Sequence, residues 1–136
     1  MTRSFGPRRS IWIEVNECDK SIENEAFLGQ LKRFDEIYRA IVATQFNFHQ
    51  SGHPGGSVSA GHIMSSLLFD SMDYDFRDPI RPDQDLLSFA AGHKATGLYA
   101  MWALRDELVR ISRPELLPSE NKFRLRFEDL LGFRRN

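Results

Sequence analysis

The stretch Ser51-Gly52-His53-Pro54-Gly55-Gly56-Ser57-Val58-Ser59-Ala60 decides how this chain is organised. It places three glycines, a proline and a histidine directly before an apolar run at residues 63–69. Glycine has no Cβ, so backbone N–H groups here can approach a ligand closely. Proline fixes the entry to the turn, and Ser57 or Ser59 is expected to cap the following helix.

A helix that begins after such a stretch offers unpaired N–H groups and a partial positive charge to an anionic oxygen. The pattern therefore predicts a loop that binds an anion, with the imidazole of His53 above it. A Gly-rich turn before a helix is also an ordinary connection, so a plain connecting turn is the alternative.

Composition narrows the class of protein. The 136 residues suffice for one modest domain with a hydrophobic core. A net charge of −1 and a pI of about 6.4 argue against nucleic acid or an anionic membrane as a partner. Cys18 is the single cysteine, which excludes an internal disulfide and fits a reducing, cytoplasmic compartment.

No apolar run approaches the length of a membrane span. The basic segment Thr2–Ser10 has no apolar stretch after it, so a secretory signal is not expected. An organelle transit peptide is disfavoured because acidic residues arrive at Glu14 and Glu17.

Apolar residues at helical spacing predict a long helix from about Phe27 to Phe48, with Asp35 among the residues of its polar face. A second helix is expected after the glycine stretch, ending near Ser71. A third is predicted at Ala95–Ile111, closed by Arg113 and Pro114. Residues 114–122 are a linker, and residues 123–131 are expected to form a short amphipathic helix.

Leu86-Leu87-Ser88-Phe89-Ala90-Ala91 is short and apolar, and predicts a buried strand, although its periodicity also permits a helical turn. One buried strand needs neighbours on both sides. Only residues 11–15 give another, weaker strand signal. We therefore expect an incomplete α/β domain, predominantly helical within this chain, at residues 27–136, preceded by an extension at residues 1–26.

A strand followed by Gly92-His93 and then a helix is the arrangement in which α/β proteins bind ligands, beyond the carboxyl end of the strand. His53 stands in the same place before another helix. Two imidazoles so placed can donate hydrogen bonds to one anionic ligand and move protons near neutral pH. The pair predicts a shared site, whereas each histidine alone is more often structural.

Two metal sites compete with this prediction, and both are disfavoured. His49 and His53 have the spacing of metal ligands, but the Gly-Pro break interrupts a helical face and no cysteine cluster accompanies them. The aspartates of residues 73–85 lack the glycine and glutamate that an EF-hand loop requires, which favours a solvated loop. His62 is expected in the first turn of its helix as a surface or packing residue.

Three motifs together carry a family resemblance: Ser51-Gly52-His53-Pro54-Gly55-Gly56-Ser57, then Pro82-Asp83-Gln84-Asp85, then Ala91-Gly92-His93-Lys94-Ala95, with Tyr99-Ala100 after them. In this combination the chain resembles the N-terminal part of transketolase, from about Leu31 to its end. One departure is Ala90, where the family commonly has serine.

The resemblance implies thiamine diphosphate and Mg²⁺ as cofactors, with transfer of a two-carbon ketol unit between sugar phosphates of the pentose phosphate pathway. It implies that His53 is catalytic, lining the reacting end of the substrate. It implies that His93 contacts the cofactor diphosphate and the substrate, and that Gly52, Gly55 and Gly92 give the backbone clearance.

The family's Gly-Asp-Gly metal motif and the glutamate that activates the cofactor do not occur in this sequence. The resemblance therefore implies a fragment cut before the metal ligands and inactive alone, with a homodimer expected only for the complete protein. Homodimeric pyruvate dehydrogenase and 1-deoxyxylulose-5-phosphate synthase are related alternatives, although His-Pro-Gly-Gly favours transketolase. A helical module that docks on a full-length homologue, or a truncated remnant, would account for the same sequence without catalysis.

Overall fold

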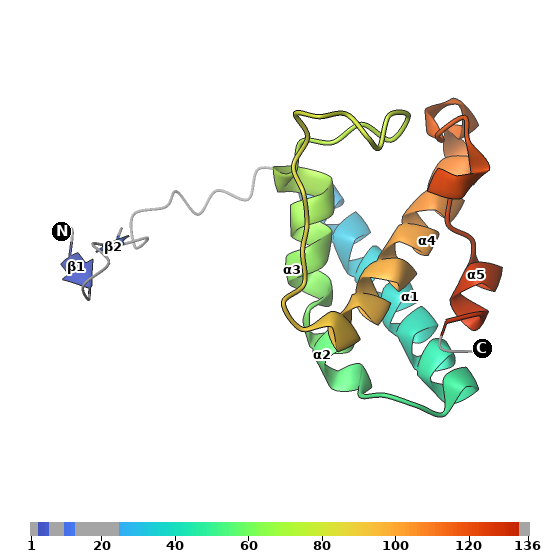
Figure 1. Cartoon of the computed structure of the whole chain (residues 1–136), viewed down its shortest axis with the longest axis horizontal. Helices are drawn as coiled ribbons and strands as arrows, with labels where there is room; N and C mark the ends of the chain where they lie inside the picture. The colour runs from blue at the N-terminus through green and yellow to red at the C-terminus, as the bar shows by residue number, and fades with distance from the viewer. Residues whose placement is uncertain (1–2, 6–9, 13–24, 134–136) are drawn as a thin grey trace.

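The computed structural model of the chain describes residues 3–5, 10–12 and 25–133 (Figure 1). Strands β1 (Arg3–Phe5) and β2 (Ser10–Trp12) pair antiparallel. The remaining elements are helical: α1 (Glu25–His49), α2 (Pro54–Ser59), α3 (Gly61–Ser66), the π-helical turn η2 (Leu67–Ser71), the 3₁₀ turn η3 (Gly92–Lys94), α4 (Ala95–Ser112), η4 (Pro114–Leu116), η5 (Asn121–Phe123) and α5 (Phe127–Leu131).

The long helix predicted at residues 27–48 is confirmed as α1. Its buried apolar positions Phe34, Tyr38 and Val42 recur every four residues, which keeps them on one face of a helix. Glu25 in the first turn complements the positive end of the helix dipole.

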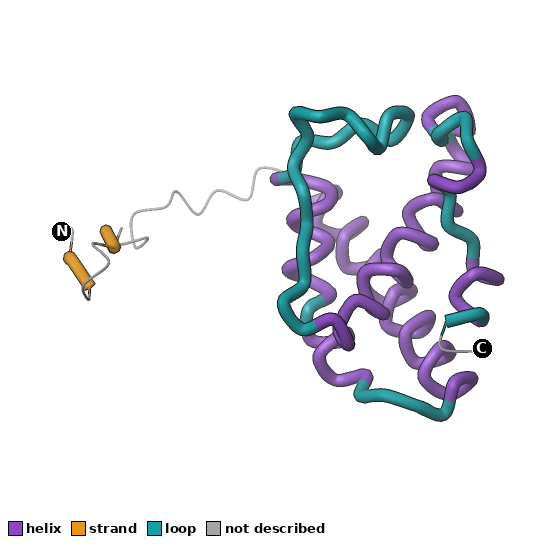
Figure 2. The backbone as a smooth tube through the Cα atoms, in the orientation of Figure 1, coloured by secondary structure: helices purple, strands orange, loops and turns teal. Residues whose placement is uncertain are grey.

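The helix predicted at residues 95–111 is confirmed as α4, which ends before Pro114. It buries Leu98, Met101 and Leu104 against α1, and Ala100 and Ala103 are fully buried. Small residues let the two helices approach closely, so the core lies between α1, α3 and α4 (Figure 2).

The glycine stretch is not a loop, because Pro54, Gly55 and Gly56 form the first turn of α2. Pro54 stands at the first helical position, where its missing N–H costs no hydrogen bond. The predicted serine cap is wrong: His53 is the N-cap residue and its side chain makes no capping hydrogen bond. The chain instead reverses at Gly52, whose φ of 101° lies in the region that favours glycine.

The second predicted helix ends at Ser71 as expected, but it consists of three consecutive pieces, α2, α3 and η2. The short helix predicted at residues 123–131 is reduced to η5 and α5, separated by extended residues. The linker at residues 114–122 contains the turn η4 and the start of η5.

The predicted strand at Leu86–Ala91 is wrong, since no strand forms there and the segment runs as an extended chain along the surface (Figure 2). The described part of the molecule therefore confirms the helical content and does not contain the sheet of an α/β domain. Of the weaker strand signal at residues 11–15, Ile11 and Trp12 lie in β2, and residues 13–15 lie outside the described residues.

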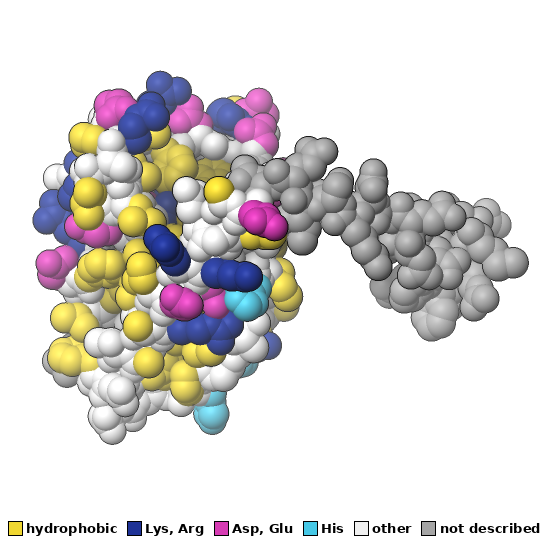
Figure 3. Space-filling model, turned by 180° about the vertical axis from the view of Figure 1, so that it is seen from behind, with side chains coloured by type: hydrophobic (Ala, Val, Ile, Leu, Met, Phe, Trp, Pro, Cys, Tyr) yellow, Lys and Arg dark blue, Asp and Glu magenta, His cyan; other side chains and the backbone are white. Residues whose placement is uncertain are grey.

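Hydrophobic side chains remain visible on the helical body among charged ones (Figure 3). The most exposed large ones are Leu86, Ile111, Ile80 and Ile63. Within the described residues, no helix has the length and apolar character that crossing a membrane requires.

Candidate functional site

Three helices cross at Tyr38. Its hydroxyl donates a hydrogen bond of 2.6 Å to the carbonyl oxygen of Ser57 in α2. Gly97 of α4 lies directly against the same hydroxyl, and a Cβ added there would stand 2.9 Å from the Cβ of Ser57. Only glycine at position 97 therefore allows α1, α2 and α4 to meet this closely.

This crossing brings the starts of the two histidine-bearing segments together. Ser57 follows His53 by four residues, and Gly97 follows His93 by four, so each contact lies about one helical turn beyond its histidine. Ser57 Oγ also donates to the carbonyl oxygen of Lys94 across 3.4 Å. The α2 start and the η3–α4 start consequently lie side by side, as Figure 1 shows.

Both predicted site histidines are exposed. His53 precedes the first turn of α2, and His93 is the middle residue of η3. Neither imidazole forms a hydrogen bond or ion pair with the residues that the structure describes. Both rings are therefore accessible to an external ligand.

The glycines around these histidines fall into two groups. At Gly56 an added Cβ would meet the exposed and flexible Lys94 side chain, 2.8 Å from its Cε and 3.1 Å from its Cγ, so that side chain would have to move aside. At Gly55 and Gly92 an added Cβ would meet nothing within 4 Å, and neither has positive φ. Open space therefore adjoins the backbone beside each exposed histidine.

The residues present fit one end of a diphosphate cofactor and not its metal. Two accessible imidazoles and two open glycine positions suit an anionic group. No group of three or more His, Cys, Asp or Glu side chains capable of holding a metal occurs in the described part of the chain. Ligands for Mg²⁺ would therefore have to come from elsewhere.

His49 is engaged by the C-terminal segment rather than by the two exposed histidines. Its Nε2 lies 2.9 Å from the carbonyl oxygen of Leu130 in α5. Its ring packs edge-on to Phe133, with the ring centroids 6.1 Å apart. These contacts give His49 a packing role between α1 and α5.

Asp35, which its spacing places on the polar face of α1, is buried in the structure and only 3% exposed. Its Oδ2 accepts a 2.5 Å hydrogen bond from Arg39 Nε and lies 3.0 Å from Nε2 of His62. His62 does stand in the first turn of α3, largely exposed, as predicted. Gly61 is pressed against Oδ1 of Asp35, so α3 covers the carboxylate.

Burial around the crossing also affects Tyr38. Desolvation, reinforced by the negative charge of Asp35, raises the pKa of the Tyr38 phenol from 10.0 to about 12. The hydroxyl is therefore a hydrogen-bond donor across the physiological pH range. The helical spacing of apolar residues in α1 includes Tyr38 but does not reveal this role. Gly97 lies four residues after His93, but the residue four positions after His53 is Ser57. The two Gly-His segments therefore share no glycine at this position that could have indicated the crossing.

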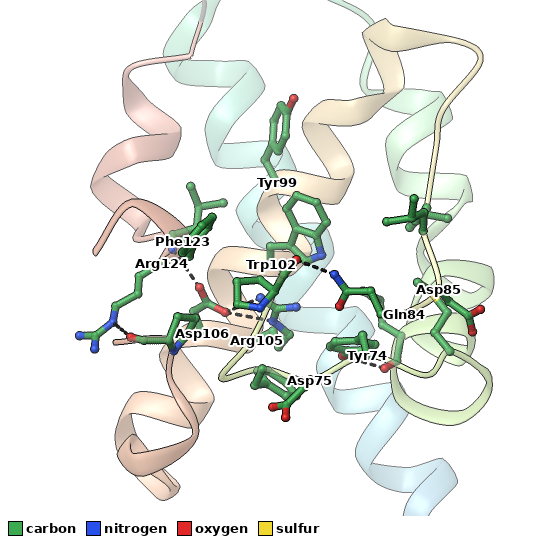
Figure 4. Close-up of a pocket in the computed structure, with 18 of the residues that line it drawn as sticks. Tyr74, Asp75, Gln84, Asp85, Tyr99, Trp102, Arg105, Asp106, Phe123 and Arg124 are labelled. Carbon is green, nitrogen blue, oxygen red and sulfur yellow. Dashed lines mark hydrogen bonds and ion pairs between the residues drawn. The ribbon is translucent and has the colours of Figure 1, made fainter. Parts of the chain in front are cut away.

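A cavity of about 430 Å³ opens between α4 and the 73–87 segment, away from both histidines (Figure 4). The Arg105 guanidinium lies 4.6 Å from the centroid of the Phe76 ring and donates hydrogen bonds of 2.8 and 3.0 Å to Asp106 Oδ1. Asp106 is 1% exposed, and its Oδ2 accepts the Leu125 N–H at 2.8 Å. The polar groups that line this side are thus engaged in holding α4 to the C-terminal segment.

Comparison with known proteins gives several relatives that carry the name transketolase or transketolase-like protein. The chain is 43% identical over 67 residues to transketolase-like protein 2 of Bos taurus, covering 49% of this chain and 10% of that protein. It is 45% identical over 53 residues to human transketolase, covering 39% and 8%. It is 35% identical over 72 residues to an apulose-4-phosphate transketolase subunit of Actinobacillus succinogenes, covering 53% and 26%.

No family model matches the chain, and no solved structure matches it. The chain spans about a tenth of the length of the mammalian relatives that it matches. These three relatives, which are 35–45% identical to the chain over the matched residues, nevertheless all carry transketolase in their names. Over about half of its length, this chain is related to the transketolases.

Proposed function

We propose that the two Gly-His segments form the histidine part of a transketolase-type site, which transfers a two-carbon ketol unit between sugar phosphates. The observation that carries this proposal is the Tyr38 crossing, because it sets the start of α2 beside the start of α4. The named relatives support the same reaction class.

Each residue has a separate role in this proposal. His53, accessible before α2, holds a hydroxyl of the substrate and moves a proton at its reacting end. His93 donates a hydrogen bond to an anionic oxygen of the cofactor diphosphate and contacts the substrate, and Gly92 leaves room for that group. When bound, thiamine diphosphate supplies the nucleophilic carbon of the reaction.

We propose that the rest of the site is formed by polypeptide other than the residues that the structure describes. No cluster of metal ligands occurs among them, so Mg²⁺ and the diphosphate charge that it would neutralise depend on a further contribution. We accordingly propose that the chain alone has no ketol-transfer activity. A complete α/β domain, a homodimer and a cytoplasmic location are proposed only for the assembled enzyme, and the division at residue 27 stays a prediction.

A titration of the histidine rings tests whether His53 and His93 share one anionic ligand. The Cε1–H resonances of all four histidines are followed by NMR while inorganic pyrophosphate is added to the full chain. We expect the signals of His53 and His93 to move together with one dissociation constant. We expect it in the millimolar range because no metal assists binding, which corresponds to a binding free energy of about −4 kcal/mol.

His49 and His62 are internal controls, since one is packed against α5 and the other is paired with Asp35. A shift of only one of His53 and His93, or unequal dissociation constants, would contradict a shared site. Saturable micromolar binding of thiamine diphosphate with Mg²⁺ by the chain alone, or measurable ketol transfer, would contradict its incompleteness. Assays with pentose phosphate and with pyruvate separate transketolase from its related alternatives in an assembled enzyme.

A further inference from the structure

The side chain of Lys94 lies across the first turn of α2. A Cβ added at Gly56 would stand 2.8 Å from the Cε of Lys94 and 3.1 Å from both its Cδ and its Cγ, so the lysine stem follows the α2 backbone closely. The lysine backbone is tied to the same place, because Ser57 Oγ donates to the Lys94 carbonyl oxygen. Lys94 therefore reaches from η3, of which it is the last residue, onto α2.

This course of the side chain carries the ammonium group between the two Gly-His segments. Lys94 directly follows His93, and Gly56 follows His53 by three residues, which is less than one helical turn. The Nζ atom lies one bond beyond the Cε that contacts Gly56. A ligand that touches both imidazoles would therefore also lie beside this positive charge.

The Lys94 ammonium has no partner in the part of the chain that the structure describes. The residue is exposed, and its Nζ forms no hydrogen bond or ion pair with another described residue. Lys122, by contrast, pairs with Glu120 at 2.8 Å. Because the stem of Lys94 rests on α2 while its charge stays in solvent, the ammonium can bind a ligand without first breaking an internal ion pair.

Acidic residues are absent from the two stretches of sequence that carry this group. Residues 50–69 and 86–105 contain three histidines, Lys94 and Arg105 but no Asp or Glu, although Asp and Glu outnumber Lys and Arg by 19 to 18 in the whole chain. Positive charge that is not balanced locally attracts anions, and the lysine ammonium is a common point-charge ligand of phosphate. The charge pattern therefore favours an anionic ligand between His53 and His93.

We infer that Lys94 is a third ligand of the anion at this site and binds a phosphoryl oxygen of the diphosphate. The inference rests on the proposed function, which makes a diphosphate the ligand of His93. Lys94 adds a full positive charge, which a hydrogen bond from a neutral imidazole does not supply. One charge offsets only part of the charge of a diphosphate, so Lys94 does not take the place of Mg²⁺.

Pyrophosphate titration of three variants of the full chain tests this role, with the histidine Cε1–H resonances as the readout at fixed ionic strength. Lys94→Gln removes the charge, Lys94→Arg keeps it, and Lys122→Gln removes an equal charge from η5. We expect the dissociation constant to rise at least about threefold in Lys94→Gln and to stay within about twofold of the parent in the other two. Unchanged binding by Lys94→Gln, or an equal loss in Lys94→Arg or Lys122→Gln, would overturn the inference.

Ionic strength separates a lost charge from disturbed packing. Raising the salt concentration from about 0.05 M to about 0.5 M screens the ammonium, so the difference between the parent and Lys94→Gln is expected to narrow. A difference that salt leaves unchanged would indicate a structural effect and contradict the charge role.

The same titration distinguishes failure of this inference from failure of the proposed function. If His53 and His93 move together and Lys94→Gln binds as tightly as the parent, the shared site stands and the role of Lys94 is excluded. If Lys94→Gln weakens binding but only one of the two histidines responds, Lys94 is a ligand and the shared site is excluded. A parent chain that binds no pyrophosphate would contradict both.

Discussion

Tyr38 donates its hydroxyl hydrogen to the carbonyl oxygen of Ser57 across 2.6 Å, and this bond ties α1 to α2 at the point where α4 also arrives. The bond is buried, so its loss leaves a carbonyl group without this donor. The stability of this crossing and the spacing of the two histidine segments thus depend on the same few atoms.

We expect Tyr38→Phe to lower the free energy of unfolding by about 1–2 kcal/mol at neutral pH, because the phenyl ring keeps the packing and loses the hydrogen bond. The difference depends on pH. The phenol pKa is raised to about 12 in the folded chain from 10.0 in the unfolded one. Its stabilising contribution is therefore complete below pH 10 and is lost as the pH rises towards 12.

By pH 12 this linkage removes about 2 kcal/mol from the parent chain and nothing from Tyr38→Phe. Urea unfolding of both proteins between pH 8 and about 12 measures the difference. A constant gap across this range would contradict the assigned burial of the phenol.

Gly97→Ala is expected to destabilise the fold by about 1–3 kcal/mol, because the new methyl group would meet the Tyr38 hydroxyl and the Cβ of Ser57. Gly55→Ala is the matched control. It also lies in the first turns of a helix, but its added Cβ meets nothing within 4 Å. Alanine there is expected to be neutral or stabilising by about 0.5–1 kcal/mol, and equal losses in the two variants would disprove the close crossing.

Arg39→Met is expected to cost about 1–2 kcal/mol, because it removes the guanidinium that pairs with the buried carboxylate of Asp35 and leaves His62 as the nearest remaining side-chain partner. The expected loss is no larger because solvent reaches the Arg39 side chain, which is 39% exposed. Arg33→Met, an exposed arginine on the same helix, is the control and is expected to change stability by less than about 0.5 kcal/mol. Thermal or urea unfolding at two salt concentrations makes the comparison.

Asp106→Ala is expected to release the C-terminal segment from α4, because this carboxylate holds both Arg105 and the Leu125 N–H. Hydrogen exchange should accelerate at residues 121–131 before it does so in α1, with a loss of about 2–4 kcal/mol in local stability. Glu107→Ala, which removes only the partly exposed ion pair with Arg110, provides the comparison. Uniform acceleration over the whole chain would argue against a local tether.

The sequence predicted the elements that local periodicity determines. Phe34, Tyr38 and Val42 repeat on one face, and α1 follows within two residues of its expected bounds. The prediction of a loop at the glycine stretch was wrong for the opposite reason, because local sequence does not determine the helix there. Pro54, Gly55 and Gly56 have poor helix propensity, and α2 forms there because Tyr38 and Gly97 hold Ser57 in place.

The strand at Leu86–Ala91 was predicted from its short apolar run, and its side chains do alternate between exposed and half-buried as those of a strand do. A strand is completed by a neighbour, which no local pattern supplies. Asp35 was misplaced in the same way, since only the arrival of Gly61 and His62 from α3 explains a buried carboxylate. The relative position of His53 and His93 likewise follows from a tertiary contact.

The fit at the Tyr38 crossing leaves no spare volume, and this constrains how the chain can diverge. A homologue that gains a methyl group at position 97 must give up comparable bulk at position 38 or 57, or else let α2 swing outward. Sizes at these three positions should therefore change together during evolution, and an isolated increase at one of them should mark a protein in which the two histidine segments have drifted apart.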